Sequence, residues 1–357
     1  MHEGINIMAI KLDYLNQNLK DEKVMLIGGA GFIGHHLALA LRDKDADVMV
    51  VDHLQVNNIV QMLNSNEYDN KKREIYIKFI LDRFELMRNK GVKFANVDAR
   101  NLSSLSDVYL SYKPTKIVHL AAISSAVVAN KTPSLAYDIQ INSLRNIIDL
   151  CKNHKDITNQ MVFMSSSTVY GDFEDKSVNE KVRPQPKGVY ANSKYIGERM
   201  MREAKSLFDL DYTIIRPSAL YGIRCISGRV SQKFVENALS GKPLILEGGG
   251  GGMLDFTHID DLTEGITRSL IYKSALSKTF NITFGNARYI SDLAKIIKVK
   301  IPNVIIEDGP KANDKPIRGT LEIDRAKEYL DFTPSITLEK GYADYCDWYL
   351  EQWSHLG

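Results

Sequence analysis

The stretch GGAGFIG, residues 28–34, decides the fold of this chain. It follows a short apolar run, VMLI (24–27), and leads into GHHLALALRDK (34–44), whose apolar residues recur with helical spacing. Its glycines at 28, 31 and 34 allow a tight turn, a close backbone approach and close packing of helix on strand. The stretch therefore predicts a strand, a glycine-rich turn and a helix whose N-terminus can face an anion.

Short apolar runs of the same kind recur along the first 217 residues. Each is nearly continuous in apolar residues, as expected for parallel strands that are covered on both faces. They are VMLIGG (24–29), DVMVVD (47–52), VKFANVD (92–98), KIVHLAA (116–122), QMVFMSS (160–166) and YTIIRP (212–217). Segments with helical spacing alternate with them, which predicts an α/β fold with a doubly wound parallel sheet.

The chain divides into three parts on this pattern. Residues 1–22 are an N-terminal extension, 23–217 a Rossmann domain, and 218–357 mainly a smaller C-terminal substrate-binding lobe with some segments returning to the Rossmann domain. A helical insertion near 55–90 contains an amphipathic stretch ended by Gly91. It is either a surface helix or an element that contacts a partner or gates the substrate.

Composition excludes several classes of function. The 357 residues are 44% hydrophobic and 25% charged with a net charge of +2, which indicates no nucleic-acid or membrane partner. No run reaches the ~18 apolar residues of a membrane helix, and the N-terminus does not read as a signal peptide. Cys151, Cys225 and Cys346 are far apart, which favours a reduced, cytoplasmic protein without a metal site.

The glycine-rich turn predicts a dinucleotide site. Asp52 ends the second strand, where a carboxylate accepts hydrogen bonds from the adenosine ribose and repels a 2′-phosphate. No arginine follows it in DHLQVNN (52–58), so NAD is preferred over NADP. Asp98, at the end of the third strand, is positioned to accept from the adenine amino group.

YANSK, residues 190–194, places Tyr190 and Lys194 on one face of a helix. A free tyrosine has a pKa of about 10, so a tyrosine base needs help near neutral pH. A nearby ammonium and the cationic oxidised nicotinamide both favour the phenolate. The hydroxyl-rich run FMSSSTVYGD (163–172) precedes this pair along the chain.

These motifs, with HLAA (119–122), RPSALYG (216–222) and DFTHIDDL (255–262), resemble in their order the extended short-chain dehydrogenases/reductases, and more narrowly the NAD-dependent nucleotide-sugar epimerase/dehydratase family. The resemblance implies a modified Rossmann domain, tightly held NAD, and a homodimer built through helices near 136–153 and 190–207. It implies that Tyr190, Lys194 and Ser166 are catalytic. The cofactor site that it implies comprises Gly28, Gly31, Phe32, Ile33, Gly34, Asp52, Asp98, Ala99, Leu120, Ala121, Ala122, Ser165 and Lys194.

Ser167 and Thr168 restrict the reaction type. Sugar-nucleotide dehydratases of the family carry an acid pair at these two positions, because elimination of water needs an acid and a base. Hydroxyls do not serve that purpose at neutral pH. We therefore expect a 4-epimerase that acts through a transient 4-keto sugar. The alternatives are a C4 dehydrogenase or reductase of a nucleotide sugar and a non-catalytic NAD-binding module.

The substrate-binding residues are the least specified. The resemblance points to Ser124 and Ser125 for the hexose, and cations favour phosphate oxygens. The cationic candidates for the diphosphate are Arg224, Arg229, Lys311 and Arg318. Ala219 and Leu254 replace an asparagine and an arginine that the family often has, which leaves UDP-, GDP-, CDP- and dTDP-sugars open.

Overall fold

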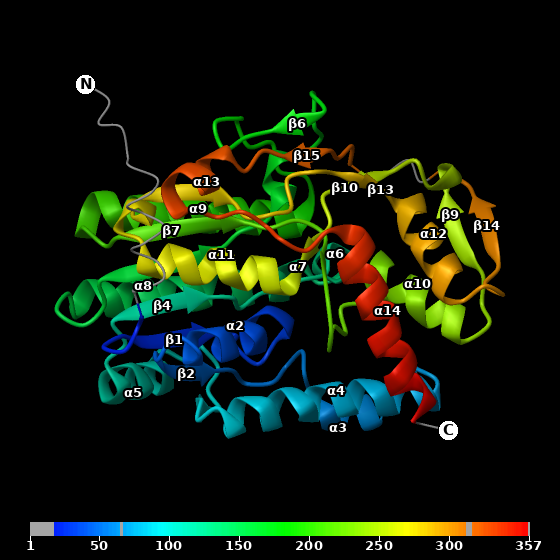
Figure 1. The fold of residues 1–357 in the computed structure, drawn as a ribbon. Coiled ribbons are helices and arrows are strands. Elements are labelled where there is room, and N and C mark those ends of the chain that lie inside the picture. Colours follow the sequence, from blue (N-terminus) through cyan, green and yellow to red (C-terminus); the bar gives the residue numbers. More distant parts are fainter. Residues whose placement is uncertain (1–17, 65–66, 312–315, 356–357) are drawn as a thin grey trace.

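The computed structural model describes residues 18–64, 67–311 and 316–355. Within these residues seven parallel strands form one sheet in the order β12-β7-β5-β4-β1-β2-β3 (Figure 1). The strands are β1 (Lys23–Ile27), β2 (Asp47–Val51), β3 (Lys93–Ala95), β4 (Lys116–His119), β5 (Gln160–Met164), β7 (Tyr212–Arg216) and β12 (Lys278–Asn281). The strand order reverses between β1 and β4, and ligands of such sheets bind at the carboxyl ends of the strands beside this point.

Helices cover both faces of the sheet, so the molecule has three layers here (Figure 1). One face carries α2 (Phe32–Arg42), α11 (Ile259–Ile271) and α13 (Asp324–Leu330), and the other carries α5 (Leu102–Tyr112), α8 (Ser143–Asn153) and α9 (Gly188–Phe208). Alternate residues of β1 enter the two cores: Val24 and Leu26 pack on the first side, Met25 and Ile27 on the second. The predicted doubly wound α/β fold is confirmed.

A smaller group of elements lies beyond the carboxyl ends of the strands, at the right of Figure 1. It contains α10 (Val230–Leu239), β9 (Leu244–Glu247), α12 (Ile290–Lys300) and β14 (Ile306–Gly309), with β9 and β14 paired in parallel. Three elements that follow residue 218, namely α11, β12 and α13, lie on or in the large sheet instead.

Short elements complete the described chain. The helical ones are α3 (Ile59–Leu63), α6 (Ala126–Lys131), α7 (Pro133–Tyr137), a π-helical turn η1 (Asp138–Asn142), and the 3₁₀ turns η2 (Ser167–Tyr170), η3 (Gly248–Gly250) and η4 (Lys273–Ala275). The short strands pair as β6 (Ser177–Val178) with β15 (Thr320–Leu321), β8 (Leu220–Tyr221) with β11 (Thr257–His258), and β10 (Met253–Leu254) with β13 (Arg288–Tyr289).

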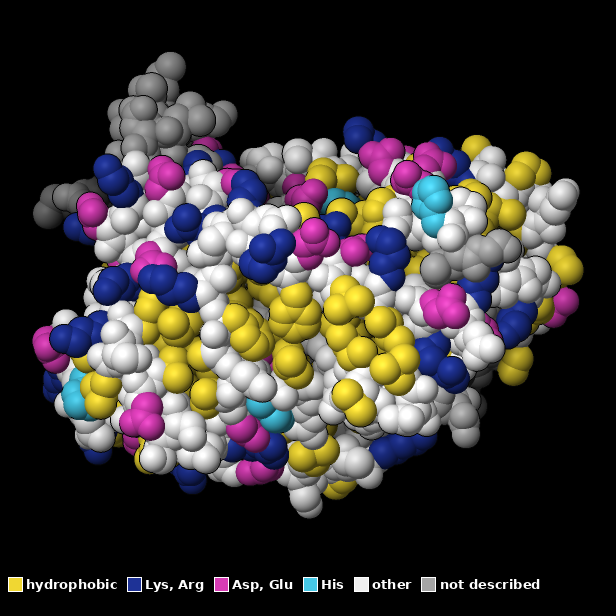
Figure 2. Space-filling model, turned by 90° about the horizontal axis from the view of Figure 1, so that it is seen from below, with side chains coloured by type: hydrophobic (Ala, Val, Ile, Leu, Met, Phe, Trp, Pro, Cys, Tyr) yellow, Lys and Arg dark blue, Asp and Glu magenta, His cyan; other side chains and the backbone are white. Residues whose placement is uncertain are grey.

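The insertion between β2 and β3 folds into α3 and the long helix α4 (Asn70–Asn89). Asp69 caps α4 by accepting from the Lys72 amide at 2.9 Å, and Gly91 follows its end with φ of +70°. The helix runs below the sheet to the C-terminal helix α14 (Leu338–Ser354), where Phe79 packs on Trp348 (Figure 1). On the side of the molecule where α3 and α4 lie, apolar side chains gather across the middle of the surface (Figure 2).

Residues 1–17 of the expected N-terminal extension lie outside the described residues. No helix of the described chain is both long and apolar enough to cross a membrane. The three cysteines, Cys151, Cys225 and Cys346, are buried and free. Within the described residues, no group of three His, Cys, Asp or Glu side chains has the arrangement of a metal site.

Candidate active site

The geometry of the turn between β1 and α2 accounts for the glycines at its three spaced positions. Gly28 has φ of +76°, and a Cβ atom there would lie 2.7 Å from Ala121. A Cβ atom at Gly34 would lie 2.3 Å from the Gly29 carbonyl oxygen. At Gly31, the N-cap of α2, the nearest atom to such a Cβ is 3.6 Å away. Two glycines thus close the turn, and the third leaves room for a phosphate at the helix N-terminus.

A cavity of about 490 Å³ opens at the carboxyl ends of the strands, next to this turn. Its size is typical of ligand sites. The structure brings most of the predicted cofactor residues to its wall, together with two predicted hexose residues and one predicted phosphate-binding residue. These are Gly28, Gly31, Phe32, Ile33, Gly34, Asp52, Asp98, Ala99, Leu120, Ala121, Ala122, Ser124, Ser125 and Arg229.

The Asp52 carboxylate is fixed against the glycine-rich turn. One oxygen accepts from the Ala30 amide at 3.0 Å and the other from the Leu54 amide at 2.8 Å. Burial raises the pKa of Asp52, and these two amide donors oppose that rise. Because a carboxylate has about four acceptor positions, it retains capacity for ribose hydroxyls. Asp52 therefore fits the role in ribose binding that its place in the sequence predicted.

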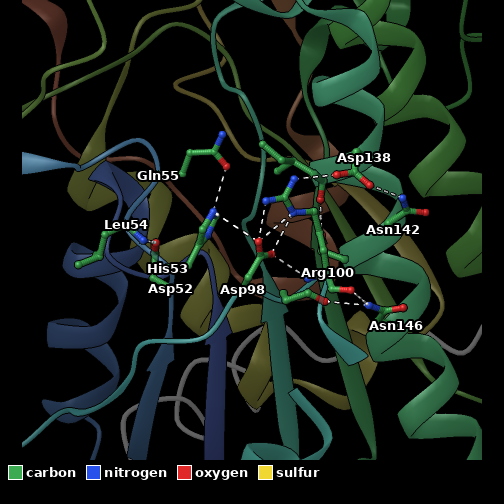
Figure 3. Close-up of polar contacts among 12 residues, drawn as sticks. Asp52, His53, Leu54, Gln55, Asp98, Arg100, Asp138, Asn142 and Asn146 are labelled. Carbon is green, nitrogen blue, oxygen red and sulfur yellow. Dashed lines mark hydrogen bonds and ion pairs between the residues drawn. The ribbon is translucent and has the colours of Figure 1, made fainter. Parts of the chain in front are cut away.

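A network of polar side chains holds Asp98 in the cavity wall, close to the segment that follows Asp52 (Figure 3). Arg100 donates to Asp98 from Nε and Nη2, and its Nη1 donates to Asp138 at 2.7 Å. His53 lies 3.7 Å from the Asp98 carboxylate and shares a hydrogen bond with Gln55. Burial alone would raise the pKa of Asp98, but the hydrogen bonds from Arg100 outweigh it and hold that pKa below its ordinary value.

The three predicted catalytic residues meet at the C-terminal end of β5. Tyr190 and Lys194 lie one turn apart on α9, with Lys194 Nζ 5.9 Å from the centre of the Tyr190 ring. Ser166 caps the 3₁₀ turn η2, where its hydroxyl accepts from the Thr168 amide at 3.2 Å, and it lies close enough to Tyr190 to lower the pKa of the phenol. Lys194 Nζ donates to the Met164 carbonyl at 2.7 Å.

Burial shifts both titratable members of this group toward their neutral forms. It raises the pKa of Tyr190, and the nearby Arg229 and Ser166 act against that rise. It lowers the pKa of Lys194 to about 7. The protein without a ligand thus does not favour the phenolate, so a further positive charge must come from what binds beside Tyr190.

The catalytic group borders the cavity and does not form its lining. Tyr190 packs against a small apolar cluster that includes Ile123 and Ile139, and both of these line the cavity. Arg229, which also lines it, is close enough to lower the Tyr190 pKa. The phenol therefore lies at the edge of the cavity, where a ligand can extend past the cofactor position.

Ser165 does not take the predicted place beside the cofactor. Its hydroxyl points to α9 and donates to Glu198 at 2.6 Å. Glu198 is fully buried and also accepts hydrogen bonds from Nε and Nη2 of Arg216, at 2.8 and 2.7 Å. Sequence reasoning missed Glu198, although it stands four residues after Lys194 and eight after Tyr190, on the same face of α9. It supports the turn that carries Ser166.

Three of the four predicted diphosphate residues lie away from the cavity wall. Arg318 donates to the carbonyls of Ser167 and Gly171, both at 3.0 Å, so it fixes the turn that follows Ser166. Lys311 is exposed and lies beside Gly248 in the smaller group of elements. The remaining one, Arg224, directs its Nε to His35, 3.2 Å away.

The insertion supplies a part of the cavity wall that no sequence motif indicated. The residues it contributes are Gln55, Val56, Asn57, Gln61, Met62, Tyr68, Tyr76 and Arg83. No spacing or residue type marked them, because they come from the loop after β2, from α3 and from α4, which only the folded chain brings to the cavity.

The two positions after Ser166 carry hydroxyl side chains and no acid. Ser167 is buried, and its amide donates to the Pro217 carbonyl at 2.9 Å. The Thr168 hydroxyl is buried and has no hydrogen-bond partner among the described residues. Neither position offers a carboxyl group near Tyr190.

Known proteins of similar sequence match this chain over nearly its whole length. Protein CapI of Staphylococcus aureus is 26% identical over 92% of this chain and 98% of its own. A putative UDP-glucose 4-epimerase of Methanocaldococcus jannaschii is 28% identical over 91% and 97%. UDP-glucuronate 4-epimerase 1 of Arabidopsis thaliana is 26% identical over 93% and 77%.

Solved structures agree with the fold. UDP-glucose 4-epimerase of Thermotoga maritima, solved with UDP-glucose, superposes with a TM-score of 0.79 at 21% identity, over 92% of this chain and 99% of its own. UDP-glucuronic acid 4-epimerase of Bacillus cereus, solved with UDP-glucuronic acid and NAD, gives 0.79 at 23% identity over 92% and 99%.

Residues 24–283 match the family model described as the NAD dependent epimerase/dehydratase family. The match contains the glycine-rich turn, Asp52 and the group of Ser166, Tyr190 and Lys194. It confirms the family and the NAD-dependent enzyme class that the sequence motifs predicted. The chain belongs to the NAD-dependent epimerase/dehydratase family.

Proposed function

We propose that the protein is a nucleotide-sugar 4-epimerase in which Tyr190, Lys194 and Ser166 are catalytic, and that its substrate is a UDP-linked hexose or hexuronic acid. The observation that carries the proposal is the grouping of Ser166, Tyr190 and Lys194 beside the dinucleotide cavity, with hydroxyls in place of acids at 167 and 168. Relatives named as UDP-glucose and UDP-glucuronate 4-epimerases support the substrate class.

The cavity residues fit NAD. The open position at Gly31 accepts a phosphate at the N-terminus of α2, and Asp52 has free acceptor positions for the ribose. Asp98 is held by Arg100 at the end where an adenine amino group would donate. When bound, NAD would supply a reversible hydride acceptor for C4 of the sugar, so the net redox change would be zero.

The side chains of this protein move the proton and hold the sugar. Tyr190 accepts the proton of the C4 hydroxyl, and Ser166 bridges that oxygen and the phenol so that the transfer is aligned. Lys194, anchored on the Met164 carbonyl, favours the phenolate when it is charged. After the 4-keto sugar rotates and presents its other face, the Tyr190 phenol returns the proton to the C4 oxygen.

The proposal excludes elimination of water by the same site. Loss of water from C5 and C6 needs a general acid and a general base near the sugar. Positions 167 and 168 carry hydroxyls, and the pKa of a hydroxyl is too far from neutrality for either task. Removal and return of hydride at C4 need only the Tyr190 centre.

Ser124, Ser125 and Arg229 are the proposed substrate contacts. All three line the cavity, and Arg229 is the cation that acts on Tyr190. A cation there attracts an anionic part of the substrate, whether diphosphate or uronate carboxylate. We propose that the group formed by α10, β9, α12 and β14 completes the substrate lobe. The three free cysteines support a reducing, cytoplasmic compartment.

The test is incubation of the purified protein with UDP-glucose, UDP-glucuronate, and GDP- and dTDP-sugars, followed by product stereochemistry and absorbance of NADH. A C4 epimer without lasting NADH supports the proposal. Stoichiometric NADH would replace it with a C4 dehydrogenase. A 4-keto-6-deoxy product would overturn the argument from positions 167 and 168.

A further inference from the structure

Arg83 is a buried arginine in the wall of the cofactor cavity, and it comes from the insertion helix α4. Only 1% of its surface is exposed. It lines the cavity with Asp52 and the glycine-rich turn, although it follows Asp52 by thirty-one positions in the sequence. Neither the sequence motifs nor the comparisons assign this residue a role.

The Asn57 side chain connects Arg83 to the glycine-rich turn. Its Nη1 donates to the Asn57 side chain at 2.9 Å, and Asn57 in turn donates to the Ala30 carbonyl at 3.2 Å. Nη2 donates to the Arg224 carbonyl. Nε is buried without a hydrogen-bond partner among the described residues. A guanidinium has five N–H donors, so donors remain for a ligand.

No carboxylate of the described residues forms an ion pair with Arg83. Asp52 acts on it at longer range, and each oxygen of the Asp52 carboxylate accepts one hydrogen bond from a backbone amide. The neighbouring Arg224 repels it, and burial lowers the pKa of Arg83 to about 10. A buried cation without a paired anion is costly, and an anionic ligand removes that cost.

The position of Arg83 identifies which anion would bind. It lies one side chain away from Ala30 and within electrostatic reach of Asp52, so it is at the dinucleotide end of the cavity. Arg229, which acts on Tyr190, is at the catalytic end. The phosphates that reach the glycine-rich turn are those of the dinucleotide.

We propose that Arg83 binds the diphosphate of the dinucleotide, opposite the N-terminus of α2, so that the insertion is a working part of the cofactor site. An arginine fork binds phosphate oxygens with two parallel hydrogen bonds. The other half of α4 is anchored in the substrate lobe, where Tyr76 donates to Glu236 and Lys72 pairs with it at 3.2 Å. The helix thereby joins cofactor and substrate parts.

The test compares ligands with and without phosphates. After bound NAD is removed, affinities for ADP and adenosine are measured by calorimetry for the wild type, R83Q and the control R88Q, which changes an exposed arginine of the same helix. Charged hydrogen bonds of this kind predict that R83Q binds ADP about 10- to 100-fold more weakly. Adenosine binding should stay within about twofold, and R88Q should match the wild type.

Two results would overturn the proposal. One is an R83Q protein that binds ADP as the wild type does. The other is an equal loss of ADP and adenosine affinity, which indicates a purely structural role for Arg83. If R83Q does not fold, R83K keeps the charge without the fork and should still lose ADP affinity selectively. The proposal rests on NAD binding by the family, so failure of the epimerase assay leaves this test unaffected.

Discussion

Tyr190 lies in surroundings that favour the protonated form of its phenol. Burial raises its pKa, and the opposing effects of Arg229 and Ser166 do not reverse the direction. The pairing of Tyr190 and Lys194 could be predicted from their spacing of one helical turn, and the family resemblance indicated Ser166. Their electrostatics could not, because burial and the approach of Arg229 depend on the tertiary fold.

Replacement of Tyr190 by phenylalanine tests its role as the base. Loss of a positioned acid–base group costs about 10²- to 10⁴-fold in turnover, so Y190F should lose epimerisation on that scale. The NAD content of the purified variant should equal that of the wild type. Y195F changes a neighbouring tyrosine of α9 and should retain activity. Activity of Y190F within tenfold of Y195F would remove Tyr190 from the mechanism.

Replacement of Lys194 by methionine tests the pKa shift. Burial lowers the Lys194 pKa to about 7 in the ligand-free protein. Between that pH and about 10, the unfolded chain holds a proton that the folded protein lacks, so stability rises with pH by up to ~1.4 kcal/mol per unit. K194M should flatten the rise of Tm between pH 7 and 9.5, whereas K131M, at an exposed position, should not. Parallel curves for K194M and the wild type would contradict the shift.

Among the elements, α4 shows what the local sequence pattern can predict and what it cannot. The apolar spacing within 71–91 and Gly91 predict its existence and its end, and the helix spans Asn70–Asn89. Its function could not be predicted, because the residues that line the cavity are defined by long-range packing on α14. Strand β12 was missed for a similar reason: it has four residues and pairs with β7 across a long stretch of chain.

The anchoring of α4 predicts the effect of Phe79→Ala. Phe79 is fully buried against Trp348, with ring centres 4.8 Å apart, and against Tyr349 at 5.6 Å. Truncation of such a phenylalanine costs about 3–5 kcal/mol, and urea unfolding should show a loss of that size. Leu81→Ala, on the exposed side of the helix, should change stability by less than about 0.5 kcal/mol. Equal stability of the two variants would show that α4 is not anchored there.

At the scale of the whole molecule, the doubly wound sheet could be predicted because most of its short apolar runs are buried on both faces, whereas the edge strand β3 is largely exposed. The helices and strands of the smaller lobe could not be predicted individually, because their apolar residues follow no simple spacing. How two copies associate also depends on surfaces and not on pattern. We propose a homodimer formed through α8 and α9, the helices that the family resemblance indicates.

Light scattering tests this dimer. The wild-type protein should have the mass of two chains, and Leu207→Asp, which places a charge at an exposed apolar position of α9, should give monomers. Val60→Asp is the matched control, because Val60 is equally exposed but lies on α3, on the side seen in Figure 2. A monomeric wild type, or dissociation by V60D alone, would contradict the proposed interface.

The central claim is that hydride leaves C4 and returns to the same carbon within one active site. The most direct measurement follows deuterium placed at C4 of the UDP-sugar that the protein converts, with mass and NMR analysis of the product. The account predicts a C4 epimer that retains its deuterium at C4, with no deuterium in solvent and no accumulation of NADH. Loss of the label to solvent, or its transfer to free NADH, would contradict it.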